Sequence, residues 1–204
     1  MKKTPEEIQA SLAPPGAGIP LLSQWLGRFL LKPLVLRRTP WEVSEKRFQR
    51  VHEKFKRELA LFQPQSLTER VLVPPMQGLE DSSRYWSAAM CARHLTIVGK
   101  NMEQVLSMLT HEEAIPRVAD TATVKPELEK NDPSAIQEYI DFGDSLIQRI
   151  QASIGNRNSR ATFAHPWFGP MTAKEWMALL SMHTRVHLQQ LRAIRAGLSV
   201  TLSV

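Results

Sequence analysis

The sequence is poor in cysteine and has no uninterrupted apolar run long enough to cross a membrane. Cys91 is its single cysteine, so no disulfide can form within the chain, as is usual for proteins of the reducing cytosol. The first 18 residues mix bases with acids and hold no apolar stretch of the kind a secretory signal needs. We therefore expect a cytoplasmic protein whose 204 residues are held together by a hydrophobic core.

Residues 18–36 come nearest to a membrane-associated segment. Arg28, Lys32 and two prolines interrupt it, whereas a spanning helix needs ~20 mainly apolar residues. Two alternatives remain for this stretch: a short helix packed on the domain, or weak contact with a membrane surface through its apolar side chains. The side chains available for that contact are Trp25, Leu26, Phe29 and Leu30.

Acidic residues are scarce in the first third of the chain. Residues 1–70 hold 13 Lys and Arg against 7 Asp and Glu, while the remainder holds 13 of each, so the net charge of +6 comes from this third. A basic surface can meet nucleic acid, anionic lipid or an acidic partner, or it can be a solvated helix face. No helix-turn-helix, zinc-finger or RNA-binding signature is visible, so we expect no specific nucleic-acid partner.

No segment shows the alternating pattern of a strand, and prolines divide the chain into amphipathic helical stretches. Each stretch follows a residue that can cap a helix; these caps are Thr39, Asp81 or Ser82, Asp132 and Thr172. The expected helices span residues 39–62, 81–110, 132–154 and 172–196. This pattern predicts an all-α fold, a four-helix bundle over residues 41–204, preceded by a helical N-terminal extension over residues 1–40.

Histidines occupy inward-facing positions on two of these helices. His183 and His187 lie four residues apart on the last helix, so both imidazoles point to one side, one turn apart. His94 lies on the inward stripe of the second helix. In a bundle these three can meet and hold one divalent metal ion, with a coordination position left for water or substrate. Imidazole ligands alone do not select among zinc, nickel, copper and iron.

Other residue patterns limit the chemistry. The zinc-peptidase motif H-E-x-x-H is missing, because Thr184 follows His183. Histidines that hydrogen-bond within the core are the alternative to a metal site. His52 also lies on an inward stripe, and we favour a hydrogen-bonded core residue over a fourth ligand or a partner of a ligand. Cys91 is a ligand or nucleophile on one interpretation and a small buried hydrophobe on the other, which is the commoner role.

The stretch HPWFGPMTAKEWMALLSMHTRVHLQQLRAI, residues 165–194, resembles the DinB/YfiT-like superfamily, and most closely a branch of unknown function. The similarity rests on His165-Pro166, the run from Phe168 to Thr172, Glu175-Trp176 and the histidine pair. His94 matches the first metal histidine of the family by its helix and spacing. The resemblance covers about residues 41–196 and leaves the first 40 outside.

This resemblance implies an up-down-down-up bundle, often a homodimer, in which His94, His183 and His187 hold zinc or nickel. It also implies a small-molecule substrate and a low-molecular-weight thiol co-substrate, since characterised relatives are thiol-dependent S-transferases or isomerases. His165 precedes the last helix and is the candidate catalytic acid or base, unless it anchors the loop. The alternative function is a metal-free or vestigial bundle that binds a partner through its basic first third.

Overall fold

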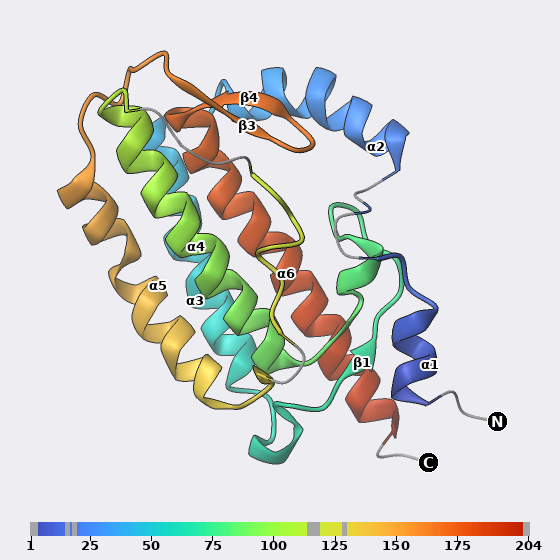
Figure 1. Cartoon of the computed structure of the whole chain (residues 1–204). Helices are drawn as coiled ribbons and strands as arrows, with labels where there is room; N and C mark the ends of the chain where they lie inside the picture. The colour runs from blue at the N-terminus through green and yellow to red at the C-terminus, as the bar shows by residue number, and fades with distance from the viewer. Residues whose placement is uncertain (1–3, 15–16, 18–19, 114–118, 128–129, 202–204) are drawn as a thin grey trace.

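The amphipathic stretches of the sequence become four long helices in a computed structural model of the chain (Figure 1). They are α3 (Trp41–Leu59), α4 (Ala88–Thr110), α5 (Ser134–Ser153) and α6 (Ala173–Thr201). The structure describes residues 4–14, 17, 20–113, 119–127 and 130–201, so parts of the predicted extension, of the loop before α5 and of the C-terminal segment lie outside the described residues. The prediction of an all-α four-helix bundle is confirmed.

Ion pairs and hydrogen bonds between the helices define their directions. α3 and α6 are parallel, because Arg37 before α3 pairs with Glu175 early in α6, and Glu58 near the end of α3 pairs with Arg192 and Arg195. α4 is parallel to α5, because the contacts Arg93–Asp132, Glu103–Arg149 and Ser107–Ser153 follow one another in the same order along both helices. α5 is antiparallel to α3, as the pairs Glu42–Arg157 and Lys56–Asp144 show. The topology is therefore up-down-down-up, and the long α4–α5 connection returns along the bundle.

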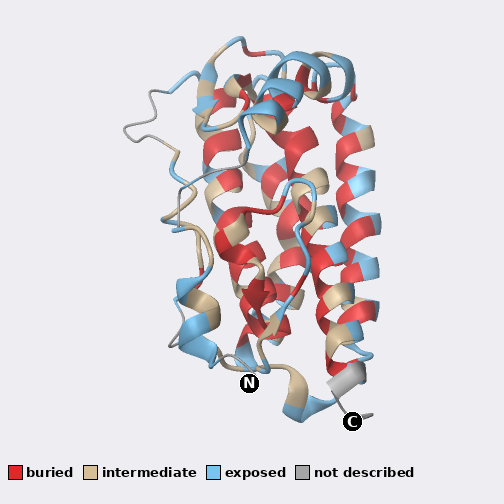
Figure 2. Ribbon diagram, turned by 90° about the vertical axis from the view of Figure 1, so that its right-hand side faces the viewer, coloured by how far each residue is buried: buried red, intermediate tan, exposed pale blue. Residues whose placement is uncertain are grey.

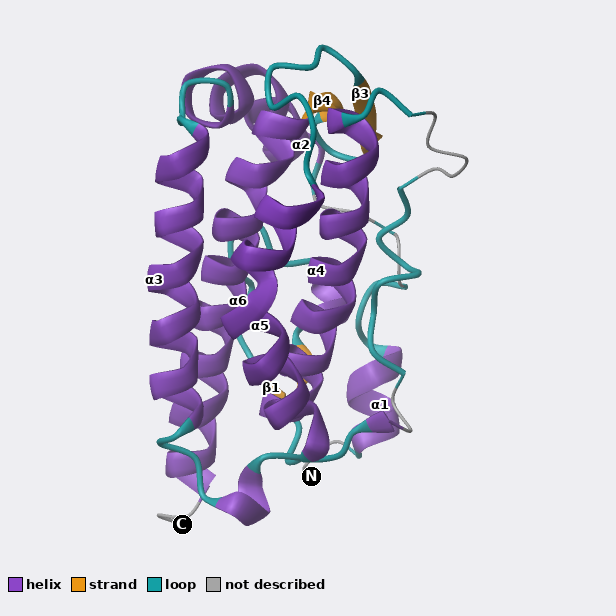
Figure 3. Cartoon of the chain, turned by 90° about the vertical axis from the view of Figure 1, so that its left-hand side faces the viewer, coloured by secondary structure: helices purple, strands orange, loops and turns teal. Residues whose placement is uncertain are grey.

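The core fills the space between the four helices in two apolar clusters (Figure 2). Trp41, Phe48 and Trp176 belong to one cluster, at the start of α3 and α6. Phe55 and Leu191 belong to the other, toward the ends of the same helices. Polar side chains cover the outer faces, as the helical period of the sequence predicts. On the side shown in Figure 3, long helices make up most of the surface.

Three of the predicted helix caps are wrong. Pro133 and not Asp132 is the N-cap of α5, and the Asp132 side chain accepts a hydrogen bond from the Ser134 N–H. Asp81 and Ser82 belong to a short 3-10 helix, η3 (Asp81–Ser83), and α4 begins later, where the Ser87 hydroxyl accepts a hydrogen bond from the Met90 N–H. Thr39 does not cap α3, because the chain before it is already helical and its hydroxyl donates to the carbonyl of residue 35. Thr172 does precede α6, and its N–H donates to the Glu175 carboxylate. α6 continues to residue 201 instead of ending at 196.

Among the residues that the structure describes, four short strands form two antiparallel pairs, although the sequence predicted none. β1 (Val71–Leu72) pairs with β2 (Tyr85–Trp86), and β3 (Thr162–His165) pairs with β4 (Gly169–Thr172). Strands of two and four residues are too short to show an alternating pattern. Gly169 closes the second hairpin with a φ of +66°, a conformation that favours glycine.

The N-terminal extension is helical as predicted. It contains α1 (Pro5–Ala10), then α2 (Leu21–Leu26), which continues directly into a π-helix, η1 (Gly27–Leu36); another short 3-10 helix, η2 (Pro64–Ser66), follows α3. Leu36 is fully buried in the same cluster as Trp41, and the Lys32 ammonium donates to the carbonyls of Phe168 and Pro170 in the β3–β4 hairpin. The extension therefore packs on the bundle, and a domain boundary at residue 40 stays a prediction. Among the described residues, no helix combines the length and apolarity needed to cross a bilayer.

Candidate metal centre

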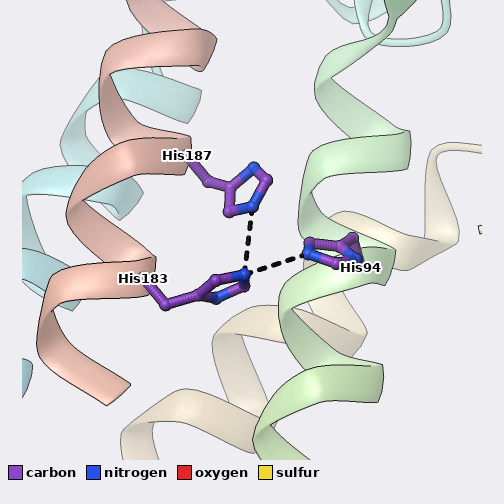
Figure 4. A group of neighbouring side chains, drawn as sticks. All are labelled: His94, His183 and His187. Carbon is purple, nitrogen blue, oxygen red and sulfur yellow. Dashed lines mark hydrogen bonds between the residues drawn. The ribbon is translucent and has the colours of Figure 1, made fainter. Parts of the chain in front are cut away.

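The bundle brings three histidines together from two antiparallel helices. His94 comes from α4, and His183 and His187 come from successive turns of α6 (Figure 4). The Nε2 atom of His183 lies 3.2 Å from Nε2 of His94 and 3.3 Å from Nε2 of His187. Ligand atoms of all three lie within 4.8 Å of one another, close enough to hold one metal ion.

The outer nitrogens of two of these imidazoles are held by fixed partners. His94 Nδ1 donates to the Val124 carbonyl at 2.8 Å, and His187 Nδ1 lies 2.7 Å from the Gln190 side-chain oxygen. The Gln190 amide nitrogen in turn donates to the Ser83 carbonyl at 2.7 Å, which leaves the Gln190 oxygen as the acceptor. Both rings therefore carry their proton on Nδ1 and direct the Nε2 lone pair inward, as metal-binding histidines do.

The inward lone pairs fit a cation. Zinc–nitrogen bonds of about 2.0–2.1 Å in a tetrahedral site place two ligand nitrogens about 3.3 Å apart, which matches both observed Nε2 separations. Without a cation, a single proton on His183 Nε2 would have to satisfy two facing acceptors. A metal ion would use all three lone pairs at once, so the donor set and its spacing suit a divalent transition metal.

The site keeps its imidazoles neutral at physiological pH. Burial lowers the pKa of His94 and His183 well below the usual range, and repulsion from neighbouring imidazoles lowers it further. Burial also lowers the pKa of His187 to about 4. Because a metal binds only deprotonated imidazole, the three rings need not lose protons before binding at pH 7.

A pocket of about 530 Å³ opens beside the three histidines. Its walls come from α4, α6, the α2–η1 segment, the β3–β4 hairpin and the chain around residues 119–125. All three imidazoles line it, which gives a small molecule access to the candidate metal position. A pocket of this volume holds a drug-sized ligand.

His165 also lines this pocket, from the end of β3. Its ring packs against Trp167, Phe168 and Trp176, and its Nδ1 accepts a hydrogen bond from the Trp167 N–H. Burial lowers the pKa of His165 to about 4, so the ring is neutral at pH 7 and carries its proton on Nε2. The residue thus contacts the hairpin and also lines the pocket, and its role as a catalytic acid or base stays a prediction.

His52 and Cys91 lie apart from the three histidines. His52 Nδ1 is 3.1 Å from the Tyr139 hydroxyl and its Nε2 is 2.9 Å from the Asp144 carboxylate, so both ring nitrogens are used. It is the hydrogen-bonded core residue that the sequence favoured. Cys91 is fully buried among apolar residues, and burial raises the pKa of its thiol. Neither residue lines the pocket.

Two charged residues in the pocket wall carry no recognisable signal in the sequence. The Lys125 ammonium lies 2.5 Å from the Glu80 carboxylate, and both side chains are largely buried. The second oxygen of Glu80, Oε1, is buried and has no hydrogen-bond partner among the described residues. Leaving such an oxygen unpaired costs free energy, and its burial keeps it out of contact with solvent.

The Gln190 amide offers a test of how the site is held. Replacing Gln190 with leucine removes the acceptor of His187 Nδ1 without changing any of the three imidazoles. We expect about 10- to 100-fold weaker zinc affinity, the usual cost of losing a partner that orients a metal-binding histidine. Competition titration against a chromophoric chelator measures this, with Gln137→Leu on the exposed face of α5 as the matched control. Equal affinities for the two variants would contradict this role for Gln190.

No protein-family model matches the sequence, and no curated protein matches it either. Among solved structures, the chain is similar to TT2238, described as a four-helix bundle protein, with a TM-score of 0.52. The match covers 76% of this chain and 99% of that chain, at 20% sequence identity. At that identity the likeness shows the fold alone. Fold and site together define a four-helix bundle with a buried cluster of three histidines beside a pocket.

Proposed function

We propose that this chain is a metal-dependent enzyme of the DinB/YfiT-like kind, in which His94, His183 and His187 hold zinc or nickel. The observation that carries the proposal is the convergence of three Nε2 atoms, two of them held with their lone pairs inward by Val124 and Gln190. The motif over residues 165–194 supports the family assignment. A bound divalent ion would supply the positive charge that keeps a thiol deprotonated at neutral pH.

The reaction we propose is transfer of a low-molecular-weight thiol to an electrophilic carbon. A bond forms between the thiol sulfur and that carbon, the bond to the leaving group breaks, and the thiol proton is released with the leaving group. The neutral His165 ring carries a proton on Nε2 in the pocket, so it can donate a hydrogen bond to the substrate.

A thiol-panel assay tests this function. Zinc- or nickel-loaded protein is mixed with glutathione, mycothiol or bacillithiol and 1-chloro-2,4-dinitrobenzene, and formation of the thioether is followed by absorbance. We expect turnover with at least one thiol, its loss in the His183→Ala/His187→Ala variant, and about 10²-fold lower kcat/KM in His165→Asn. The control is His111→Ala, on the exposed end of α4. Turnover that survives loss of both metal histidines would overturn the proposal.

A second candidate function is that of a metal-free bundle that binds an acidic partner. It is favoured by one observation: α3 exposes a row of basic side chains, which are Lys46, Arg47, Arg50, Lys54 and Arg57. The two candidates differ in what they need from the histidines. Partner binding through α3 would survive replacement of His183 and His187, whereas thiol transfer would not.

A further inference from the structure

Three helical stripes face the pocket, and apolar side chains dominate all three. They are Val98, Met102 and Val105 on α4; Trp176, Leu179, Met182 and Val186 on α6; and Leu26, Leu30, Leu31, Leu34 and Val35 on the α2–η1 segment. On α4 and α6 the members recur every three or four positions, and on the α2–η1 segment Leu26 is followed four positions later by the pair Leu30-Leu31 and then by the pair Leu34-Val35. Each helix therefore turns one continuous apolar face toward the same space. The pocket is thus an apolar channel with helical walls.

The three histidines lie at one end of this channel. α4 and α6 are antiparallel, and His94 contacts both His183 and His187, so Val105 and Trp176 lie together at the other end. His94 and Val105 are eleven positions apart, which corresponds to about 16 Å of helix. A volume of about 530 Å³ spread over that length describes a long, narrow pocket.

The buried charged groups of the channel lie near the three histidines, whereas one neutral polar ring, His165, contacts Trp176 toward the other end. Lys125 follows Val124, whose carbonyl accepts the His94 proton, and Lys125 pairs with Glu80. Beyond them, toward Val105, the side chain of Asn101 donates to the carbonyl of its own helix at residue 97. The polar side chains at residues 120 and 123 are exposed to solvent. A ligand that matches this distribution has its most polar group at the end near the three histidines and is mainly apolar along the rest of its length, where His165 is the one buried polar ring beside it.

Apolar side chains also rim the channel where it meets solvent. Leu30 and Leu34 line the pocket, yet 46% and 51% of their surface is exposed. Exposed leucines at the rim of an apolar channel gain by contact with an apolar ligand, because that contact removes their surface from water. Leu22, one of the apolar residues on the same segment, is 70% exposed and does not line the pocket.

From these observations we propose that the substrate carries an elongated aliphatic chain, which lies between α4, α6 and η1 with its reactive polar end at the histidines. This inference names the substrate class of the function proposed above and rests on it. In the same arrangement the N-terminal extension is a wall of the substrate site. The aliphatic chain of the substrate is held mainly by apolar contact, so its binding does not require a metal ion.

Binding of n-alkanols tests the proposal with the full chain. Alkanols from hexanol to dodecanol are titrated against the fluorescence of bound N-phenyl-1-naphthylamine. We expect affinity to rise about fourfold for each added methylene until the channel is filled, and then to level off. Leu30→Asp and Leu34→Asp place a charge on the rim at exposed positions and should weaken dodecanol binding at least tenfold. The matched control, Leu22→Asp, should bind dodecanol as the wild type does.

The outcomes separate this inference from the proposed function. The His183→Ala/His187→Ala variant should keep the chain-length dependence although it loses the metal ligands, so alkanol binding is read independently of metal. The same affinity along the alkanol series would overturn the aliphatic substrate, even if the protein binds zinc. If Leu22→Asp and Leu30→Asp weakened dodecanol binding equally, the leucines at the rim would not be part of the binding site.

Discussion

Zinc at about 100 times its Kd should raise the Tm of the wild-type chain by about 5–10 °C and leave the Tm of His183→Ala/His187→Ala unchanged. A ligand at that concentration that binds only the folded state stabilises it by about 2.7 kcal/mol. For a domain of this size, 1 kcal/mol shifts Tm by about 2–4 °C. The double variant keeps only His94 of the three ligands, so the stabilisation should disappear.

The comparison is made within each variant, with and without zinc, because removing two partly or fully buried rings also changes packing. Calorimetry gives the Tm shift, and elemental analysis of protein purified without chelator should find about one ion per wild-type chain. The Tm of His111→Ala, which removes a histidine outside the cluster, should rise on addition of zinc as much as that of the wild type does. A zinc-dependent shift of the same size in the double variant would mean that zinc binds elsewhere.

The pairing of His183 with His187 could be predicted from the sequence because it depends only on the period of one helix. Placing His94 opposite them required the bundle, which the amphipathic pattern of the four stretches predicted and the resemblance supported. The groups that orient these rings could not be predicted in the same way. The Val124 carbonyl is a backbone group in the long α4–α5 connection, so no side chain marks it. Gln190 looks like an ordinary polar residue of an amphipathic helix until its contact with Ser83 is known.

The start of α4 illustrates a different limit of sequence reasoning. Asp81, Ser82 and Ser87 are all good capping residues, and propensity does not choose among them. Pairing of β1 with β2 extends the chain at Tyr85 and Trp86, so the helix begins only after Ser87. Which cap is used is thus decided by contacts with residues far away in the sequence.

For residues 18–36 the sequence shows that the stretch is apolar, but it does not show which surface the apolar side chains contact. The sequence predicted either a packed helix or contact with a membrane surface. The described part of the stretch packs on the bundle through Leu36 and Lys32. Its inward-facing apolar side chains line the pocket. Leu22, Trp25 and Phe29 remain 70%, 54% and 56% exposed, so the outer apolar face needed for membrane contact is present, and that contact stays a prediction.

Acidification from pH 7 to pH 5 should destabilise the metal-free chain through its buried histidines. The pKa of His165 and of His187 is about 4 in the folded chain, against about 6.5 when unfolded. Between these values the unfolded state binds more protons, so the free energy of unfolding falls as pH falls. Each of the two histidines should lower the free energy of unfolding by about 2 kcal/mol between pH 7 and pH 5. His94 and His183, whose pKa values are also lowered, act in the same direction.

Urea unfolding in the presence of EDTA at pH 7, 6 and 5 measures this loss. A combined fall of about 4 kcal/mol from His165 and His187 is a large part of the 5–15 kcal/mol typical of a folded domain. The lowered pKa values of Asp81, Asp132 and Asp144 act only at more acidic pH, so they do not contribute in this window. His165→Asn keeps an acceptor for the Trp167 N–H and cannot titrate, so its fall should be about 2 kcal/mol smaller than that of the wild type. A flat profile, or the same fall in both proteins, would show that His165 is not held neutral by burial.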